Sequence, residues 1–312
     1  MEFAHVPVLL EECMEGLLLK DGGIFVDGTI GGAGHSSEIL KRTKNSTLVG
    51  IDRDTEALEA SKKRLSEFGD RVVLVHSNFN NIREVAEAQG VDGNVDGILI
   101  DLGVSSYQLD NESRGFSFRF DSPLDMRMDQ SSDGINASDV VNNYSESELK
   151  RIFKEYGEER FAGNIARKIC NVRQQKPIQT TFELRDIILS SVPRYKGHDG
   201  KSNVTRVFQA IRIEVNNELG GLEKAIRDAA SVLKAGGRIA IISFHSLEDR
   251  IVKNTFKDMA CDCVCPHDFP ICVCDHRATM KIITNHPITA NDAELVQNSR
   301  SASAKLRVAE KL

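Results

Sequence analysis

A glycine-rich turn is the first stretch of this chain that could bind a small ligand. Residues Asp27–Ser36 read DGTIGGAGHS, and a short apolar run at residues 24–26 precedes them. Glycine allows positive φ angles and lets a ligand come close to the main chain. A helix that starts next, near Ser36, would add N–H groups and a favourable dipole. The stretch therefore predicts a strand, a turn that holds a nucleotide-like ligand, and a helix.

A carboxylate further along strengthens this prediction. Asp52 ends a second apolar run, Leu48–Ile51, roughly 20 residues beyond the turn, where it can accept hydrogen bonds from ribose hydroxyls. Nicotinamide-dependent oxidoreductases and S-adenosylmethionine-dependent methyltransferases both combine these features. Asp27 at the end of the first strand favours a methyltransferase, because a carboxylate there can meet the methionine amino group of the cofactor.

The elements that must position these residues alternate between strands and helices. Further buried strands are predicted at residues 72–75, 97–100 and 238–243. This alternation is typical of a parallel sheet that binds ligands at its carboxyl edge. We expect an α/β, Rossmann-like class I methyltransferase fold whose catalytic domain is discontinuous, residues 1–110 and 206–312.

The intervening residues, 111–205, lack a comparable strand and are predicted to be a helical insert. Capping-box patterns start at Ser145 and Thr180, each with a glutamate three residues later and an apolar helical face beyond. We expect this insert to be a second domain that recognises the substrate.

Composition limits the class of protein. The 312 residues are 40% hydrophobic and 28% charged, as in ordinary globular proteins. No apolar run reaches the ~20 residues that a membrane span needs, and the N-terminus does not resemble a secretory signal, so we expect a cytoplasmic protein without membrane contacts. The net charge of −6 argues against broad coating of nucleic acid but allows a local basic groove.

Five of the seven cysteines are clustered near the C-terminus: Cys261, Cys263, Cys265, Cys272 and Cys274. Disulfides are rare in the cytosol, so metal binding is an alternative. The C-x-C spacing is tighter than that of ordinary structural zinc sites, and methyl transfer needs no metal.

Longer segments carry a resemblance to a known family. They include HVPVLLEE from His5, DGILIDLGVSSYQLD from Asp96, RGFSFRFDSPLDMRMD from Arg114 and ISFHSLEDRIVK from Ile242. With these, essentially the whole chain resembles the bacterial small-subunit ribosomal RNA cytosine-N4 methyltransferases, the RsmH (MraW) family. The resemblance implies N4-methylation of a cytosine in 16S ribosomal RNA near the decoding centre, with S-adenosyl-L-methionine as cofactor.

The resemblance also implies the cofactor contacts. Backbone groups of the turn would hold the methionine part, Asp52 the ribose, and aromatic and acidic side chains the adenine end. The implied residues are Ala33, Gly34, His35, Asp52, Phe79, Asp101 and Gln108. Ala33 stands where the family usually has glycine, and we expect its single methyl group to be tolerated.

Catalysis must activate the exocyclic amine of cytosine, a poor nucleophile, so positioning and polarisation of its N–H₂ group should supply the rate. We expect Asp101 or nearby backbone carbonyls to accept the amine hydrogens, with Ser105 and Ser106 near the base. Alternatively, Asp101 serves only the cofactor. His245, after the strand at 238–243, either orders the base or phosphate or caps a helix.

The expected partner is small-subunit ribosomal RNA, in the assembled subunit. The oligomeric state stays open, with a homodimer as one option. The alternatives are a non-catalytic ribosome-assembly or RNA-binding protein and a nicotinamide-dependent oxidoreductase.

Overall fold

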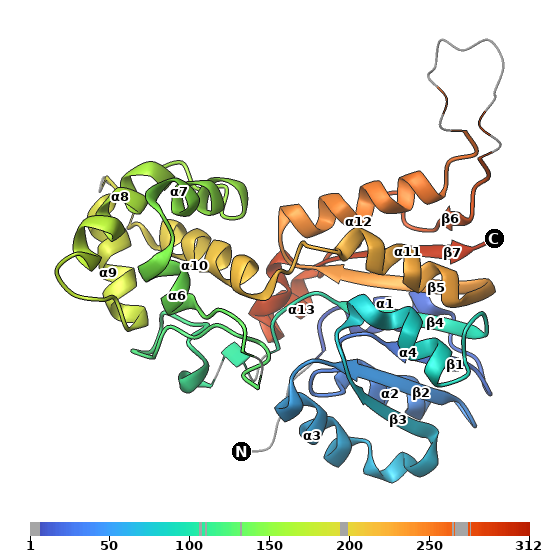
Figure 1. The fold of residues 1–312 in the computed structure, drawn as a ribbon. Coiled ribbons are helices and arrows are strands. Elements are labelled where there is room, and N and C mark those ends of the chain that lie inside the picture. The colour runs from blue at the N-terminus through green and yellow to red at the C-terminus, as the bar shows by residue number, and fades with distance from the viewer. Residues whose placement is uncertain are drawn as a thin grey trace. The chain divides into compact units, whose positions relative to one another are not determined.

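The computed structural model describes residues 7–105, 108–109, 111–131, 133–193, 199–263, 265, 274 and 276–312. The chain forms two compact units (Figure 1). The first combines Met1–Gly103 with Gly221–Leu312, and the second is Val104–Gly220. The predicted boundaries, after residues 110 and 205, therefore differ from those of the structure.

A seven-stranded sheet is the centre of the first unit, with the strand order β3-β2-β1-β4-β5-β7-β6. Neighbouring strands from β3 to β5 pair in parallel, and β7 is antiparallel to both β5 and β6. The strands are β1 (Ile24–Asp27), β2 (Thr47–Asp52), β3 (Val72–His76), β4 (Val95–Asp101), β5 (Leu233–Ser243), β6 (Met280–Ile282) and β7 (Lys305–Lys311).

Helices cover both faces of this sheet, so its central strands are buried and mostly apolar. Every residue of β4 from Val95 to Ile100 is buried. One apolar core lies under α4 (Ile82–Ala88), α11 (Leu222–Val232) and α12 (Ser246–Met259). The other lies under α1 (Leu10–Leu17) and α2 (Gly34–Arg42) and is joined by Leu58 of α3 (Thr55–Arg64). The remaining short helices of this unit are η1 (Ser66–Arg71), η2 (Phe79–Asn81), α13 (Asp292–Gln297) and η4 (Ser299–Ser303).

Strand β7 was not anticipated from the sequence. It inserts between β5 and β6, and the Arg307 guanidinium on it contacts Asp249 of α12 at 2.6 Å. Although burial opposes ionisation, Arg307 holds the pKa of Asp249 below its ordinary value. Arg307 is 7% exposed, and this ion pair gives it a structural role.

The second unit is helical in the residues that the structure describes. Its elements are η3 (Glu112–Arg114), α6 (Ala137–Asn143), α7 (Glu146–Glu155), α8 (Ala162–Arg173), α9 (Thr181–Ser191) and α10 (Lys201–Asn216). The capping boxes predicted at Ser145 and Thr180 are confirmed. The predicted boundary after residue 205 would divide α10, whose apolar face packs in the core of this unit with α6, α7 and α9.

Two buried polar groups organise this unit. Arg114 is 1% exposed and donates to the carbonyl oxygens of Arg127 and Met128, so its role is structural. The side-chain amide of Asn203 donates to both carboxylate oxygens of buried Glu159. Among the described residues, no helix is both long and apolar enough to cross a membrane.

Candidate cofactor and active site

Strand β1 ends in a carboxylate that braces the glycine turn. Asp27 is 2% exposed. Its Oδ1 accepts from the Thr29 N–H at 3.1 Å, and its Oδ2 accepts from the Ser36 hydroxyl at 2.6 Å. Burial raises the pKa of Asp27 to about 6, and the Ser36 hydrogen bond opposes that shift. The side chain thus joins the start of the turn to the first residues of α2.

Two positions of the turn have left-handed backbone. Gly31 has φ of 51° and Ala33 has φ of 56°. Such a conformation costs an ordinary L-residue about 1–2 kcal/mol. The Ala33 methyl group is fully buried in the core beneath α1 and α2, which offsets part of that cost at about 0.8 kcal/mol per buried carbon. This burial of the methyl group explains why alanine is tolerated at position 33.

Gly32 is a glycine that the fold itself does not require. Its φ is not positive, and a Cβ built on it would meet only the end of the Arg64 side chain, at 3.9 Å. The neighbouring carbonyl groups are held from α3, since Ser61 donates to the Gly31 oxygen at 2.6 Å and Arg64 to the Gly32 oxygen at 2.7 Å. The open space at Gly32 is what a ligand approaching the main chain needs.

The second carboxylate, Asp52, is hydrogen-bonded to the same turn. Its Oδ2 accepts from the Gly31 N–H at 2.8 Å, and its Oδ1 accepts from the Asp54 N–H at 2.9 Å. Burial raises its pKa. Each carboxylate oxygen can accept a further hydrogen bond, so the pair of oxygens can still receive two adjacent ribose hydroxyls.

Phe79 lies beside the first glycine of the turn. It starts η2 directly after β3, is half-buried, and packs partly against the core beneath α4 and α11. A Cβ built on Gly28 would lie 3.4 Å from the Phe79 Cβ. The Phe79 side chain therefore lies next to the start of the turn.

The third carboxylate is Asp101, at the end of β4. Its backbone N–H donates to the Thr29 hydroxyl at 2.6 Å, and its Oδ1 accepts from the Gly103 N–H at 3.2 Å. Burial raises the pKa of Asp101 to about 6, the Gly103 bond opposing the shift and nearby Glu248 adding to it. Asp27, Asp52 and Asp101 are thus all connected to one turn, although they end three different strands.

His245 is the N-cap of α12. Its Nδ1 accepts from the Glu248 N–H at 3.4 Å, and the Glu248 carboxylate accepts from the Phe244 and His245 N–H groups at 2.8 and 3.3 Å. His245 Nε2 lies 3.0 Å from Glu248 Oε1. Of the two alternatives for His245, the structure shows the helix cap. Glu248, which is 1% exposed, was not predicted as a site residue, although the spacing His245-x-x-Glu248 is that of a capping box.

Ser105 and Gln108 belong to the second unit and bond to each other. The Ser105 N–H donates to Gln108 Oε1 at 3.0 Å, and the Gln108 N–H donates to Ser105 Oγ at 3.2 Å. This reciprocal pair is the pattern of a capping box, and it gives both predicted site residues a structural role. Gln108 is 4% exposed. The third predicted residue of this segment, Ser106, lies outside the described residues.

His35 contacts the protein rather than the face of the turn. Its Nε2 lies 2.9 Å from the Val8 carbonyl oxygen, and burial lowers its pKa. The neutral ring therefore donates from Nε2 to Val8. A contact of His35 with the cofactor would use its backbone, as that of Gly34 would at the first position of α2.

The fold and these contacts define a class of protein: an α/β enzyme with a nucleotide-type cofactor site at the carboxyl edge of a mainly parallel sheet. Residues 2–312 match the MraW methylase family, and the chain belongs to that family.

Curated relatives named "Ribosomal RNA small subunit methyltransferase H" align with the full chain. The relative from Carboxydothermus hydrogenoformans is 55% identical over 312 residues, which are 100% of this chain and 99% of its own. Those from Clostridioides difficile and Finegoldia magna are 54% and 51% identical, each over 100% of both chains. These matches confirm the predicted family and the methyltransferase activity. They also confirm the class I methyltransferase fold and S-adenosylmethionine as its cofactor. Neither the oxidoreductase nor the non-catalytic RNA-binding protein is favoured.

Proposed function

We propose that this protein transfers the methyl group of S-adenosylmethionine to the exocyclic N4 of a cytosine in 16S ribosomal RNA, near the decoding centre. The small-subunit substrate is supported by the names of the full-length relatives. The acceptor atom and the decoding-centre position are what the family resemblance implies, which the motifs around Asp101 and His245 help to carry. The observation that carries the proposal is the bonding of Asp27, Asp52 and Asp101 to one turn.

The residues present fit the cofactor. The backbone of Ala33, Gly34 and His35 would hold its methionine part, although the Ala33 N–H itself donates to the Ile30 carbonyl oxygen at 2.7 Å. Asp52 would accept hydrogen bonds from the ribose hydroxyls. Phe79 and Asp101 would line the adenine end. The family resemblance implies that Gln108 also contacts the cofactor, in addition to its bond to Ser105. When bound, the cofactor supplies an electrophilic methyl group on a positive sulfur.

Asp101 is the residue that we propose activates the cytosine amine. An ionised Asp101 accepts a hydrogen bond from the cytosine N–H₂ group, which raises the electron density on the nitrogen and aligns it for in-line attack. Its pKa of about 6 keeps it ionised at neutral pH and lets it take the proton that the nitrogen loses. We expect Ser105 and Ser106 near the base from their position in the sequence after β4. His245 acts indirectly, by fixing the backbone after β5.

The remaining proposals concern the partner. The second unit provides substrate recognition, and the substrate is the assembled small subunit in the cytoplasm. A homodimer is one possible oligomeric state, which gel filtration with light scattering would establish.

The test uses tritiated S-adenosylmethionine and small ribosomal subunits from cells that lack this protein. We expect label in N4-methylated cytidine after nuclease digestion, and none with the Asp101→Ala variant. The control is Gly163→Ala, because a Cβ on Gly163 meets only the Lys150 side chain at 3.8 Å. If the protein binds the cofactor but no labelled cytidine appears, the assignment of cytosine N4 as the acceptor is wrong. If only free RNA is labelled, the assembled subunit is not the substrate.

A further inference from the structure

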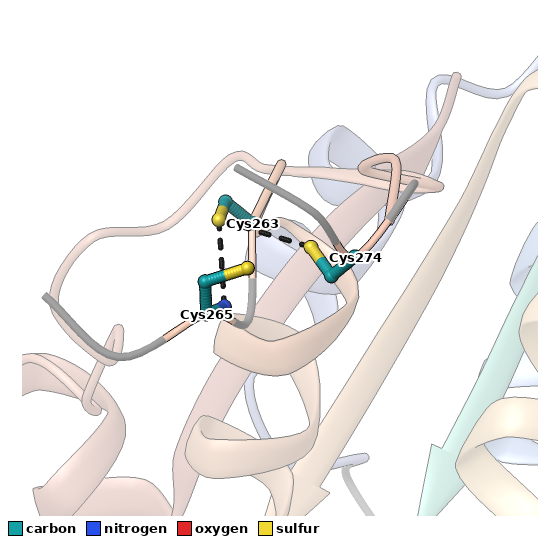
Figure 2. A group of neighbouring side chains, drawn as sticks. All are labelled: Cys263, Cys265 and Cys274. Atoms are coloured by element: carbon teal, nitrogen blue, oxygen red, sulfur yellow. Dashed lines mark hydrogen bonds between the residues drawn. The ribbon is translucent and has the colours of Figure 1, made fainter. Parts of the chain in front are cut away.

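Three cysteine sulfurs are close together in a part of the first unit that methyl transfer does not use. The Sγ atoms of Cys263, Cys265 and Cys274 all lie within 4.8 Å of one another (Figure 2). They belong to the connection between α12, which ends at Met259, and β6, which starts at Met280. Cys274 reaches the other two from the far side of that connection.

The spacing of the sulfurs fits a metal better than a disulfide. Cys263 Sγ and Cys274 Sγ are 3.8 Å apart, whereas a disulfide bond is about 2.05 Å long. Zinc–thiolate bonds are about 2.3 Å long and tetrahedral, which places neighbouring ligand sulfurs about 3.8 Å apart. The observed separation therefore equals one edge of a zinc–thiolate tetrahedron.

The surrounding backbone supports thiolates at this position. The Cys265 N–H donates to Cys263 Sγ at 3.4 Å (Figure 2), a bond that favours the charged form of a ligand sulfur. The base of the connection is closed by the Thr279 N–H, which donates to the Met259 carbonyl oxygen at 2.8 Å. The two ends of the connection are thus held together by the protein itself.

We propose that Cys263, Cys265 and Cys274 bind one structural zinc ion. Zinc requires a fourth ligand, and three residues nearby in the sequence can supply it. Cys261 is partly exposed, with its thiol donating to the Cys263 carbonyl oxygen at 2.7 Å. His276 has a buried Nε2 without a hydrogen-bond partner among the described residues. Cys272 lies outside the described residues.

The first experiment measures metal in the full-length protein, purified under reducing conditions without chelator. We expect about one zinc per chain by elemental analysis, released when a mercurial reagent modifies the thiols. Cys263→Ser, Cys265→Ser and Cys274→Ser should each retain less than roughly one tenth of it. The control is Cys170→Ser, because Cys170 lies on α8 of the second unit, and this variant should keep its zinc.

A second experiment identifies the metal ligands from an absorption spectrum, without depending on the amount of zinc recovered. Replacement of zinc by Co²⁺ should give the strong visible absorption of tetrahedral cobalt–thiolate, and its loss in Cys261→Ser, Cys272→Ser or His276→Asn identifies the fourth ligand. Binding of S-adenosylmethionine to each variant verifies folding, and its failure in the wild type would contradict the proposed function instead. Three results would overturn the zinc proposal. They are the absence of zinc after reconstitution, an iron–sulfur chromophore, and a Cys263–Cys274 disulfide in the reduced preparation.

Discussion

Asp52 Oδ2 accepts a hydrogen bond from the Gly31 backbone N–H at 2.8 Å, so the carboxylate that ends β2 directly fixes the turn that follows β1. The same side chain is proposed to bind the cofactor ribose. Its position therefore depends on the turn, and the conformation of the turn depends on it.

Asp52→Ala should weaken binding of S-adenosylmethionine by about 10- to 100-fold, because hydrogen bonds to a charged group contribute roughly 1.5–3 kcal/mol. Titration calorimetry with the cofactor measures this change. Asp54→Ala is the comparison, since Asp54 caps α3 through the Glu56 N–H and should lose about 1 kcal/mol of stability with little change in affinity. Equal affinity losses in both variants would contradict a ribose contact.

Gly32→Ala should leave the protein folded and weaken the cofactor affinity by at least about tenfold, since a methyl group would occupy the side from which the ligand approaches. Gly50→Ala is the opposite case, because its Cβ would come within 2.2 Å of Ile30 Cδ1. That variant should be destabilised by about 1–3 kcal/mol. Melting temperature and cofactor titration distinguish the two effects. Unchanged affinity in Gly32→Ala would mean that the ligand does not approach this part of the turn.

Asp101 should make both stability and activity depend on pH. Its folded pKa, about 6, lies above the ordinary 3.8, so ionisation favours the unfolded state. The stability should fall as pH rises from about 4 to about 6 and stay reduced above that. Asp101→Asn should therefore stabilise the protein by about 1–3 kcal/mol at pH 8 and by little at pH 4.

The same variant should lose methyl transfer, while the wild-type rate rises with pH through an apparent pKa near 6. Chemical denaturation at pH 4 and pH 8 gives the stability, and single-turnover transfer gives the rate. An Asp101→Asn protein with full activity would restrict Asp101 to a structural role. Asp27, whose pKa is also raised to about 6, should leave a residual pH dependence of stability in that variant.

The Ser105–Gln108 pair allows capping to be separated from catalysis. Ser105→Ala should cost about 0.5–2 kcal/mol, and Ser105→Asp should restore most of it, because aspartate is also a good N-cap. If the Ser105 hydroxyl donates to the base, Ser105→Asp stays inactive despite its restored stability. Recovery of both stability and rate would show that Ser105 is only a cap. Unfolding free energy and single-turnover rate are the two measurements.

His245→Asn tests the assignment of His245 as a helix cap. Asparagine is a favourable N-cap, so the stability should change by less than about 0.5 kcal/mol and the turnover rate by less than about threefold. Glu248→Ala should instead cost about 1–3 kcal/mol, because the Phe244 N–H would lose its acceptor. A turnover rate that falls roughly 100-fold in His245→Asn, with unchanged stability, would show that the imidazole takes part in the reaction.

The sequence alone predicted the features that depend on neighbouring residues. The glycine turn, the strands ending in Asp27, Asp52 and Asp101, and the capping boxes at Ser145 and Thr180 are local patterns of backbone conformation and hydrophobic periodicity. The full-length family resemblance supplied the cofactor and the type of reaction. Two further local patterns, Ser105-x-x-Gln108 and His245-x-x-Glu248, were present in the sequence. Ser105 was instead expected near the base and Gln108 at the cofactor, and the role of His245 was left open between a substrate contact and a helix cap.

Only the tertiary structure decided the features that join distant parts of the chain. The place of β7 between β5 and β6 depends on pairing with strands far away in sequence, and periodicity does not identify a partner. The buried Arg307–Asp249 pair and the attachment of α10 to the second unit have the same origin. The closeness of Cys274 to Cys263 and Cys265 likewise depends on how the connection from α12 to β6 folds back, because residue spacing does not determine the distance between sulfur atoms.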